Sequence, residues 1–371
     1  MPCGKRCIIT IVVVVLLSLP CLGNAASTLV EANEQTRQLV RQTMKEQRIP
    51  GLQVAIIKDD KVVLSESYGL ANVENRVPVT NETLFPINSA TKSFTGVAMM
   101  QLAEAGLLDL NAPVSRYLAD LPKAWQGVRV RQLLAHTSGL PNIVDRQGLI
   151  GGGTELDAWK AVKEQPMVAP IGEQFAYNQT NYGLLAQIII KQTKMPFERY
   201  FAERQFAVAG MRTSTFGDSY DLVANSATIY SYSRRRMLVE GDDNRLAHWI
   251  DDLPPGLRTG GGIQTTVDEL ARWIIALSKG SLISAISVNS MWTPEKLNNG
   301  ADGKWAAGWP VLRTSPDRQV AGIGGGRSAF VVYPDDRLAI IVLTNLVGAS
   351  PENFIPQIAE FYEPFRSERS K

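Results

Sequence analysis

The sequence predicts an α/β (α+β) fold in which one sheet is made from both ends of the chain. Strand-like runs rich in Val, Ile and Leu lie near the N-terminus, at residues 52–57 and 62–64, and near the C-terminus, at residues 329–333 and 338–343. Between about 110 and 255 the pattern is one of helices and long polar or Pro/Gly-containing loops. This order indicates a sheet with flanking helices and a mainly helical region inserted between its two halves.

The first element in the chain is a predicted signal peptide over residues 1–25. Lys5 and Arg6 precede an apolar run from Ile8 to Leu17, and small residues follow before the next charged residue. This order is typical of a secretory leader, here cleaved near Ala25. The alternative is a membrane anchor, but the run is shorter than the ~20 residues that a bilayer needs. We expect an exported protein, periplasmic or secreted, with no stable membrane span after cleavage.

The composition of the remaining domain, residues 26–371, excludes several classes of function. Cys3, Cys7 and Cys21 all lie in the leader, so the mature chain has no disulfide, thiolate nucleophile or thiolate metal site. The whole chain has 38 Lys and Arg against 36 Asp and Glu, and the leader carries two of the basic residues. The mature chain is therefore neutral and has no general attraction to nucleic acid or anionic membranes.

Histidine supplies another bound, because the chain has only His136 and His248. Two distant histidines are too few for an imidazole metal centre, and no metal or organic cofactor is expected. The Gly-x-Ser-x-Gly pattern of a nucleophile elbow does not occur in the sequence. A serine nucleophile in this chain is therefore expected to use a base other than histidine.

The N-terminal half of the sheet region begins with a helix-permissive segment at residues 30–48. The strands at 52–57 and 62–64 follow, and Asp59-Asp60 between them is a plausible hairpin turn. A strong helix is predicted from Ser89 to about Ala105, ending at Gly106, because its apolar side chains recur at helical spacing.

The C-terminal half begins after the inserted region. A helix is predicted at residues 266–277, a strand at 309–312 and a closing helix near 352–365, in addition to the two strands already named. The sheet part of the domain is thus expected over residues 26–110 and 256–371, and the helical insertion over about 111–255.

Ser89 and Lys92 are candidate catalytic residues. The sequence Ser-Ala-Thr-Lys puts a hydroxyl and an amine about one helical turn apart at the start of a helix. A serine hydroxyl becomes a nucleophile when a neighbouring base takes its proton, and a lysine can be that base when burial lowers its pKa. The helix N-terminus adds positive potential and a free N–H for an oxyanion. The plain alternative is that Ser89 caps the helix and Lys92 points to solvent.

Longer stretches of the mature chain resemble the serine β-lactamase and penicillin-binding-protein superfamily, most closely its class C and esterase-like branch. Three stretches match family motifs in family order: LFPINSATKSF at residues 84–94, LLAHTSGL at 133–140 and GGGIQTTVDELA at 260–271. The resemblance implies a β-lactamase-like fold with a mainly antiparallel sheet and Ser89 as the nucleophile. It also implies that His136 is a buried, hydrogen-bonded structural residue.

The family usually carries a second catalytic element, Tyr-x-Asn, whose tyrosine is a general base or proton relay beside the lysine. In FAYNQTNYG, residues 175–183, Tyr177 takes the tyrosine position and Gln179 the asparagine position. Gln179 keeps the amide and adds one methylene, so it can still reach Lys92 or substrate. The alternative for Tyr177 is a packed aromatic residue, which is what we expect of Tyr182.

The third family element departs further from the pattern. Family members place Lys or His before a glycine pair on the strand that edges the site, and here AGIGGGRSAF, residues 321–330, puts Ile323 at that position. An isoleucine offers a substrate carboxylate neither a charge nor a hydrogen bond. Arg327, four residues further on, is a candidate electrostatic replacement.

The glycines of this third element are expected to bind substrate through their backbone. Gly324 and Gly325 let a substrate lie close to the strand beside Ile323. The N–H groups of Ser89 and Gly326 are expected to form the oxyanion hole.

Together these residues predict an exported serine hydrolase that cleaves an ester or amide through an acyl-serine intermediate, most simply an esterase for a small uncharged acyl group. The first alternative is a class C-type β-lactamase or D-amino-acid peptidase, with a β-lactam or cell-wall peptide as substrate. The second alternative is a binding or regulatory homologue without turnover, for which the departures at Gln179 and Ile323 are the evidence. The sequence leaves the physiological substrate and the oligomeric state open.

Overall fold

The computed structural model describes Met1 and residues 22–145, 148–232, 245–314 and 317–362. Most of the predicted leader, residues 1–25, lies outside the described residues, and the first described helix, α1 (Leu22–Gln47), includes Ala25. Within the described part of the chain, no helix combines the length and apolar character that a bilayer crossing requires.

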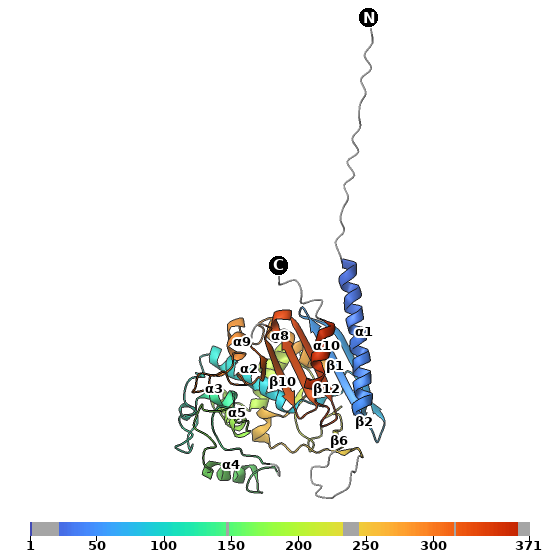
Figure 1. The fold of residues 1–371 in the computed structure, drawn as a ribbon. Helices are drawn as coiled ribbons and strands as arrows, with labels where there is room; N and C mark the ends of the chain where they lie inside the picture. The colour runs from blue at the N-terminus through green and yellow to red at the C-terminus, as the bar shows by residue number, and fades with distance from the viewer. Residues whose placement is uncertain (2–21, 146–147, 233–244, 315–316, 363–371) are drawn as a thin grey trace.

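A seven-stranded antiparallel sheet runs through the centre of the protein in the order β3-β2-β1-β12-β11-β10-β9 (Figure 1). Its strands are β1 (Gly51–Lys58), β2 (Lys61–Asn72), β3 (Val77–Pro78), β9 (Val311–Arg313), β10 (Gln319–Gly324), β11 (Ser328–Tyr333) and β12 (Leu338–Thr344). The first strand pairs with the last, from Leu52 opposite Thr344 to Lys58 opposite Leu338. The predicted antiparallel sheet built from both ends of the chain is confirmed.

The turn between β1 and β2 is the predicted one. Asp59 and Asp60 have φ angles of 50° and 58°, and Lys58 pairs with Lys61 across them. Two successive left-handed residues form the turn type that matches the twist of a two-residue hairpin, and aspartate tolerates that conformation.

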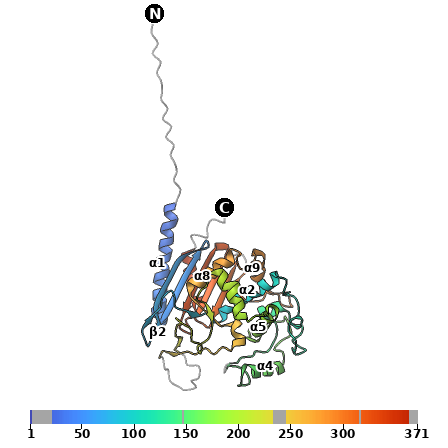
Figure 2. The ribbon, with the colours of Figure 1, turned by 180° about the vertical axis from the view of Figure 1, so that it is seen from behind.

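Each face of the sheet is covered by its own helices and its own hydrophobic cluster (Figures 1 and 2). The first cluster joins one face to α2 (Thr91–Glu104) and α8 (Val267–Ser278), and the second joins the other face to α1 and α10 (Ile355–Phe361). Side chains alternate between the faces of a strand, so Ile341 belongs to the first cluster and its neighbour Ile340 to the second.

A chain of buried aromatic rings holds α2 against the sheet. Phe94 on α2 stacks on Trp273 of α8 with ring centroids 3.8 Å apart, Trp309 lies 5.9 Å from Trp273, and Phe330 of β11 lies 5.5 Å from Trp309. Large rings packed in this way dominate core energetics and leave little freedom of position. The N-terminal end of α2, where Ser89 lies, is therefore fixed relative to the sheet.

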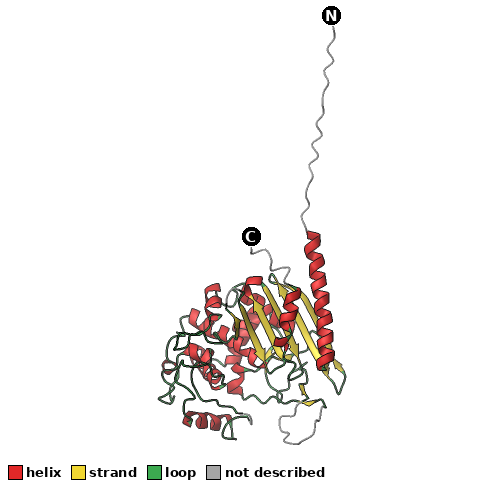
Figure 3. Ribbon diagram, in the orientation of Figure 1, coloured by secondary structure: helices red, strands yellow, loops and turns green. Residues whose placement is uncertain are grey.

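In the described part of the inserted region, helices are the main regular secondary structure, but more of its residues lie in the loops that join them than was predicted (Figure 3). Its helices are α3 (Val130–Leu134), α4 (Glu155–Glu164), α5 (Thr180–Thr193), α6 (Phe197–Phe201) and α7 (Ala207–Ala209), and α9 (Ala285–Met291) follows α8. Short strands form two small sheets: β4 (Phe85–Pro86), β8 (Ile263–Thr265) and β5 (Thr215–Phe216), and the pair β6 (Tyr230–Ser231) and β7 (Ala247–His248).

Candidate active site

Ser89, Lys92 and Tyr177 meet at the N-terminal end of α2. Ser89 lies in a single 3₁₀ turn, Asn88–Ala90, that leads directly into the helix. Its Oγ is 2.7 Å from the Tyr177 hydroxyl and accepts a hydrogen bond from Lys92 Nζ at 3.3 Å. The structure thus brings the candidate nucleophile into direct contact with two groups that can accept a proton, the arrangement that a serine-based acyl transfer requires.

Lys92 is completely buried, and its ammonium group is surrounded by acceptors. Besides Ser89 Oγ, Nζ donates to Gln179 Oε1 at 3.1 Å and to the Gly260 carbonyl at 2.5 Å. Burial lowers the pKa of Lys92 below its ordinary value, and Tyr177 offsets only part of that effect. Because burial disfavours the charged form, Lys92 is closer to the neutral state that a base needs.

Gly260 is a site residue whose role was not predicted, although it lies in one of the matched motifs. A Cβ at this position would be 2.8 Å from Gln179 Oε1 and 3.3 Å from Lys92 Nζ. Only a glycine lets this carbonyl approach the lysine without crowding the amide beside it. Tyr182 completes the enclosure, since it is buried and its ring centroid is 4.8 Å from Lys92 Nζ.

The ring of His136 packs against the ring of Tyr177. The two ring centroids are 4.3 Å apart, and Nδ1 of the buried histidine accepts hydrogen bonds from the Asn178 N–H at 3.3 Å and Asn181 Nδ2 at 3.1 Å. Because Nδ1 accepts both bonds, the neutral ring carries its proton on Nε2. Burial, followed by the charge of Lys92, lowers the pKa of His136 well below 6.5, so the ring stays neutral. His136 is the buried, hydrogen-bonded residue that was expected.

Trp305, which was not predicted from the sequence, packs against His136 and Tyr177 at the candidate site. Its ring lies edge-on to both His136 and Tyr177, with centroids 4.8 and 5.6 Å away. Asn142 was also missed, and its Oδ1 accepts from the Gln179 N–H at 2.8 Å. Neither residue stands in a pattern that marks it, because each reaches the site through a loop whose path the local sequence does not specify.

The glycine turn between β10 and β11 lies directly against the backbone of Ser89. A Cβ on Gly324 would be 1.9 Å from the Ile87 carbonyl oxygen and 2.9 Å from Ser89 N, so the two backbones are in contact. Gly325 and Gly326 both have a φ of 61° and close the turn. Among the described residues, neither the Ser89 nor the Gly326 N–H donates to a protein acceptor, so both remain available to a ligand.

Ile323 does not join this group. Its partly buried side chain packs against the second cluster, on the face of β10 opposite to that on which Gly324 meets Ser89. The expectation that Arg327 substitutes for the family's Lys or His is not met. Its side chain is 1% exposed and forms an ion pair with Asp251. The position of β10 that faces the nucleophile is Gly324, which carries no side chain.

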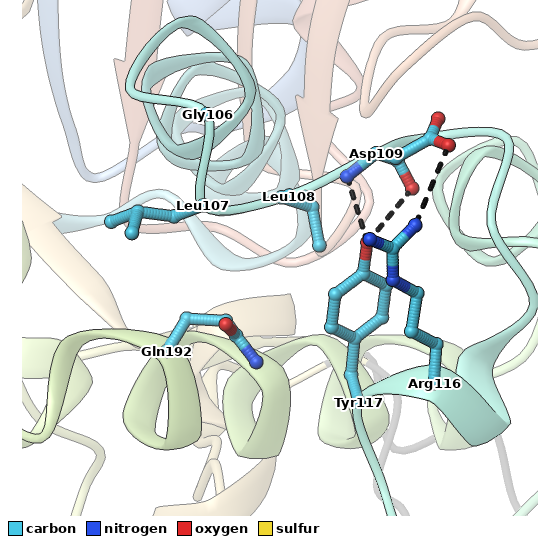
Figure 4. A pocket seen from close by; sticks show the side chains of 7 residues that line it. All are labelled: Gly106, Leu107, Leu108, Asp109, Arg116, Tyr117 and Gln192. Atoms are coloured by element: carbon cyan, nitrogen blue, oxygen red, sulfur yellow. Dashed lines mark hydrogen bonds and ion pairs between the residues drawn. The ribbon is translucent and has the colours of Figure 1, made fainter.

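A surface hollow elsewhere on the molecule is separate from this site. Figure 4 shows that it is lined by residues at the C-terminal end of α2 and nearby: Gly106, Leu107, Leu108, Asp109, Arg116, Tyr117 and Gln192. Since α2 has 14 residues, the hollow lies about 20 Å from Ser89 along the helix. In the described ranges, no three His, Cys, Asp or Glu side chains are grouped to hold a metal.

Comparison with known proteins places the chain in a family. The family model Beta-lactamase matches residues 36–360. Penicillin-binding protein 4* of Bacillus subtilis is 30% identical over 304 residues, which cover 76% of this chain and 65% of the relative. The chain spans about two thirds of the length of the curated relatives that it matches.

Solved structures agree. The octameric penicillin-binding protein homologue from Pyrococcus abyssi aligns with a TM-score of 0.71 and 26% identity, covering 87% of this chain and 77% of that one. EstCE1, a hydrolase with promiscuous acyltransferase activity, aligns with a TM-score of 0.73 over 91% of this chain and 99% of its own, and its 20% identity speaks for the fold alone. The predicted resemblance is confirmed: the chain belongs to the beta-lactamase family, and penicillin-binding proteins are among its relatives.

Proposed function

We propose that this protein is a serine hydrolase that cleaves small, uncharged esters through an acyl-enzyme on Ser89. The observation that carries the proposal is the contact of Ser89 Oγ with the Tyr177 hydroxyl at 2.7 Å and with the buried Lys92 amine at 3.3 Å. A hydroxyl in contact with two groups of this kind is arranged for nucleophilic catalysis.

In acylation, Ser89 Oγ attacks the carbonyl carbon while its proton passes to the Tyr177–Lys92 pair. The N–H groups of Ser89 and Gly326 stabilise the negative charge that develops on the carbonyl oxygen. The same pair returns the proton to the departing alkoxide as the ester bond breaks. Water then attacks the acyl-serine, releases the acid and restores Ser89, with its proton moving through the same groups.

The preference for an uncharged acyl group follows from strand β10. Ile323 packs against the second cluster, and Arg327, the cation of the glycine turn, is buried against Asp251. A substrate carboxylate lying along β10 would meet neither a charge nor a hydrogen-bonding side chain at these two positions. A neutral ester needs no charged partner at these two positions, so its binding is not weakened by the absence of one.

A β-lactam or D-peptide hydrolase is the second candidate, favoured by the similarity to penicillin-binding proteins. In that case Gln179, whose Oε1 already accepts from Lys92, would also contact the amide of the substrate. A homologue without turnover is the third candidate and rests on the departures at Gln179 and Ile323.

One set of assays separates the three. The mature protein and its Ser89→Ala and Tyr177→Phe variants are treated with a fluorophosphonate probe, a chromogenic short-chain ester and a chromogenic cephalosporin. We expect labelling and ester hydrolysis that vanish in Ser89→Ala, and a fall of about 10²–10⁴ in kcat in Tyr177→Phe. Faster cephalosporin than ester turnover would favour the second candidate, and a folded wild type without labelling or hydrolysis would favour the third.

We further propose export through the predicted leader, with cleavage near Ala25. The support is the basic, apolar and small-residue order of residues 1–25. N-terminal sequencing of protein recovered outside the cytoplasm should begin near Ala26. Recovery of the uncleaved chain in the membrane fraction would contradict the proposal.

A further inference from the structure

The turn that carries Ser89 and the glycine turn share one partly buried partner, the carboxylate of Asp251. Oδ2 of Asp251 accepts a hydrogen bond from Asn88 Nδ2 at 3.0 Å and another from a terminal nitrogen of Arg327. Its Oδ1 accepts from Trp249 Nε1 at 3.0 Å. Asn88 immediately precedes Ser89, and Arg327 immediately follows the glycines at 324–326. The Asp251 carboxylate thus contacts one side chain from each of the two segments that border Ser89.

On the nucleophile side, this contact fixes an unusual backbone conformation. Asn88 has a φ of 43°, in the left-handed region that few residues other than glycine adopt and that asparagine tolerates best. Its amide nitrogen is anchored by Asp251, and the direction of the following Ser89 N–H depends on that anchored conformation. Loss of the carboxylate would free Asn88 to turn.

On the glycine side, Arg327 depends on the same group. The arginine is 1% exposed, and within the described part of the chain Asp251 is the acceptor that its guanidinium contacts, while Nε has no partner. A buried charge is strongly destabilising when its counter-charge is removed. Between the two side chains lies Gly325, where a Cβ would be 2.8 Å from Asn88 Oδ1 and 3.3 Å from Arg327 Cζ.

We infer that Asp251 is a positioning residue of the active site. Its carboxylate holds the Ser89 turn and the Gly324–Gly326 turn at the separation at which their N–H groups face one carbonyl oxygen. The inference rests on the proposed acyl-serine chemistry for its effect on rate, whereas the coupling of the two turns is a property of the folded chain alone.

The rate test compares Asp251→Asn with Asp252→Asn, which removes the same charge from the adjacent, exposed residue. We expect kcat for a chromogenic ester to fall by about 10²-fold in Asp251→Asn with KM nearly unchanged, because misplacement of reacting groups costs rate rather than ground-state binding. Asp252→Asn should behave as wild type. Should Asp251→Asn fail to fold, Asp251→Leu/Arg327→Met removes both charges of the ion pair and should show the same loss of kcat.

Hydrogen exchange provides a readout that does not need turnover. Peptides containing residues 86–91 and 322–328 should both exchange faster in Asp251→Asn, or in the double variant, and not in Asp252→Asn. Unchanged exchange in either peptide overturns the inference, as does a wild-type kcat in Asp251→Asn. If the wild type neither labels nor hydrolyses esters, the proposed function fails, and the exchange result still decides whether Asp251 couples the two turns.

Discussion

At the scale of single residues, the site depends on one amine that the fold keeps out of water. Lys92 is completely buried, and its partners are neutral oxygen atoms rather than a carboxylate. Taking an ammonium group out of water costs free energy unless it is paired with a counter-charge. The burial that lowers the pKa of Lys92 therefore also destabilises the folded state.

Lys92→Met should reveal both effects. The unfolded chain holds the Lys92 proton up to its ordinary pKa of 10.5, whereas the folded chain releases it at a lower pH because of burial. Between those two pH values the unfolded state binds more protons, so the stability of the wild type should rise with pH relative to Lys92→Met, by up to about 1.4 kcal/mol per pH unit. Denaturant unfolding from pH 7 to pH 10.5 measures this difference. Ester kcat/KM should fall by about 10²–10⁴ in the variant. Parallel stability curves would contradict the burial effect.

His136 should make the protein sensitive to acid. Burial places the pKa of His136 in the folded chain well below 6.5. Below pH 6.5 the unfolded chain therefore binds a proton at this residue while the folded chain does not, and the folded state loses stability. His136→Asn places Oδ1 where Nδ1 accepts from the Asn178 N–H, and asparagine tolerates the left-handed φ of 57° at this position. We expect the wild type to lose stability relative to His136→Asn between pH 6.5 and pH 5, in urea unfolding followed by circular dichroism. A difference that stays constant with pH would show that His136 is not the titrating group.

At the scale of elements, the site is a junction between the start of α2 and the turn that joins β10 to β11. The aromatic chain from Phe94 to Phe330 fixes α2 against the sheet, and Gly324 brings the end of β10 onto the Ser89 backbone. Glycine is required because the contact is between two backbones.

Gly324→Ala should therefore lower the activity strongly and weaken the fold. Its Cβ would lie 1.9 Å from the Ile87 carbonyl oxygen, so strand or helix must shift. Overpacking of this kind costs about 1–3 kcal/mol, and displacement at the nucleophile should lower kcat about 10²-fold or more. Gly127→Ala is the matched control, because its nearest neighbour would be Ile171 Cδ1 at 3.7 Å, and it should stay within about 0.5 kcal/mol of wild type. Ester kinetics and thermal melts of both variants check this, and a fully active Gly324→Ala would show that the two backbones are not in contact.

Sequence reasoning found the elements with clear periodicity and missed those defined by tertiary contact. The Asp59-Asp60 turn and the helix after Ser89 carry local signals, and the structure has both. Strand β10 was expected only through the family resemblance, because its glycine-rich sequence has low strand propensity of its own. The position of Ile323 on the far face could not be read from the sequence, since a shift of one residue reverses every side chain of a strand.

The same limit applies to the site. Ser89 and Lys92 are three residues apart on one helix, so helical geometry predicts their contact. Asp251 and Trp305 come from distant loops, and their approach depends on the whole packing arrangement. Local sequence carries no comparable signal for them.

At the scale of the whole molecule, the two ends of the chain are interlocked at the centre of the sheet. β1, the first strand, lies between β2 and β12, and β12 is the last strand, so neither half of the sheet is complete without the other. The inserted region supplies Tyr177 and Gln179, which contact Ser89 and Lys92 at the start of α2, and α2 itself is packed against one face of the sheet. Activity should therefore be lost together with the sheet rather than before it.

Ile341→Ala tests this coupling, because Ile341 is fully buried on β12, pairs with Ala55 of β1 and belongs to the cluster that packs against α2. Removing its side chain should cost about 2–5 kcal/mol. Ile286→Ala, at a position 83% exposed on α9, should change stability by no more than about 0.5 kcal/mol. In urea titrations of wild type and both variants, ester hydrolysis and circular dichroism should show the same midpoint, and Ile341→Ala should move both midpoints equally to lower urea. An activity midpoint well separated from that of the circular dichroism signal would mean that the site and the sheet unfold independently.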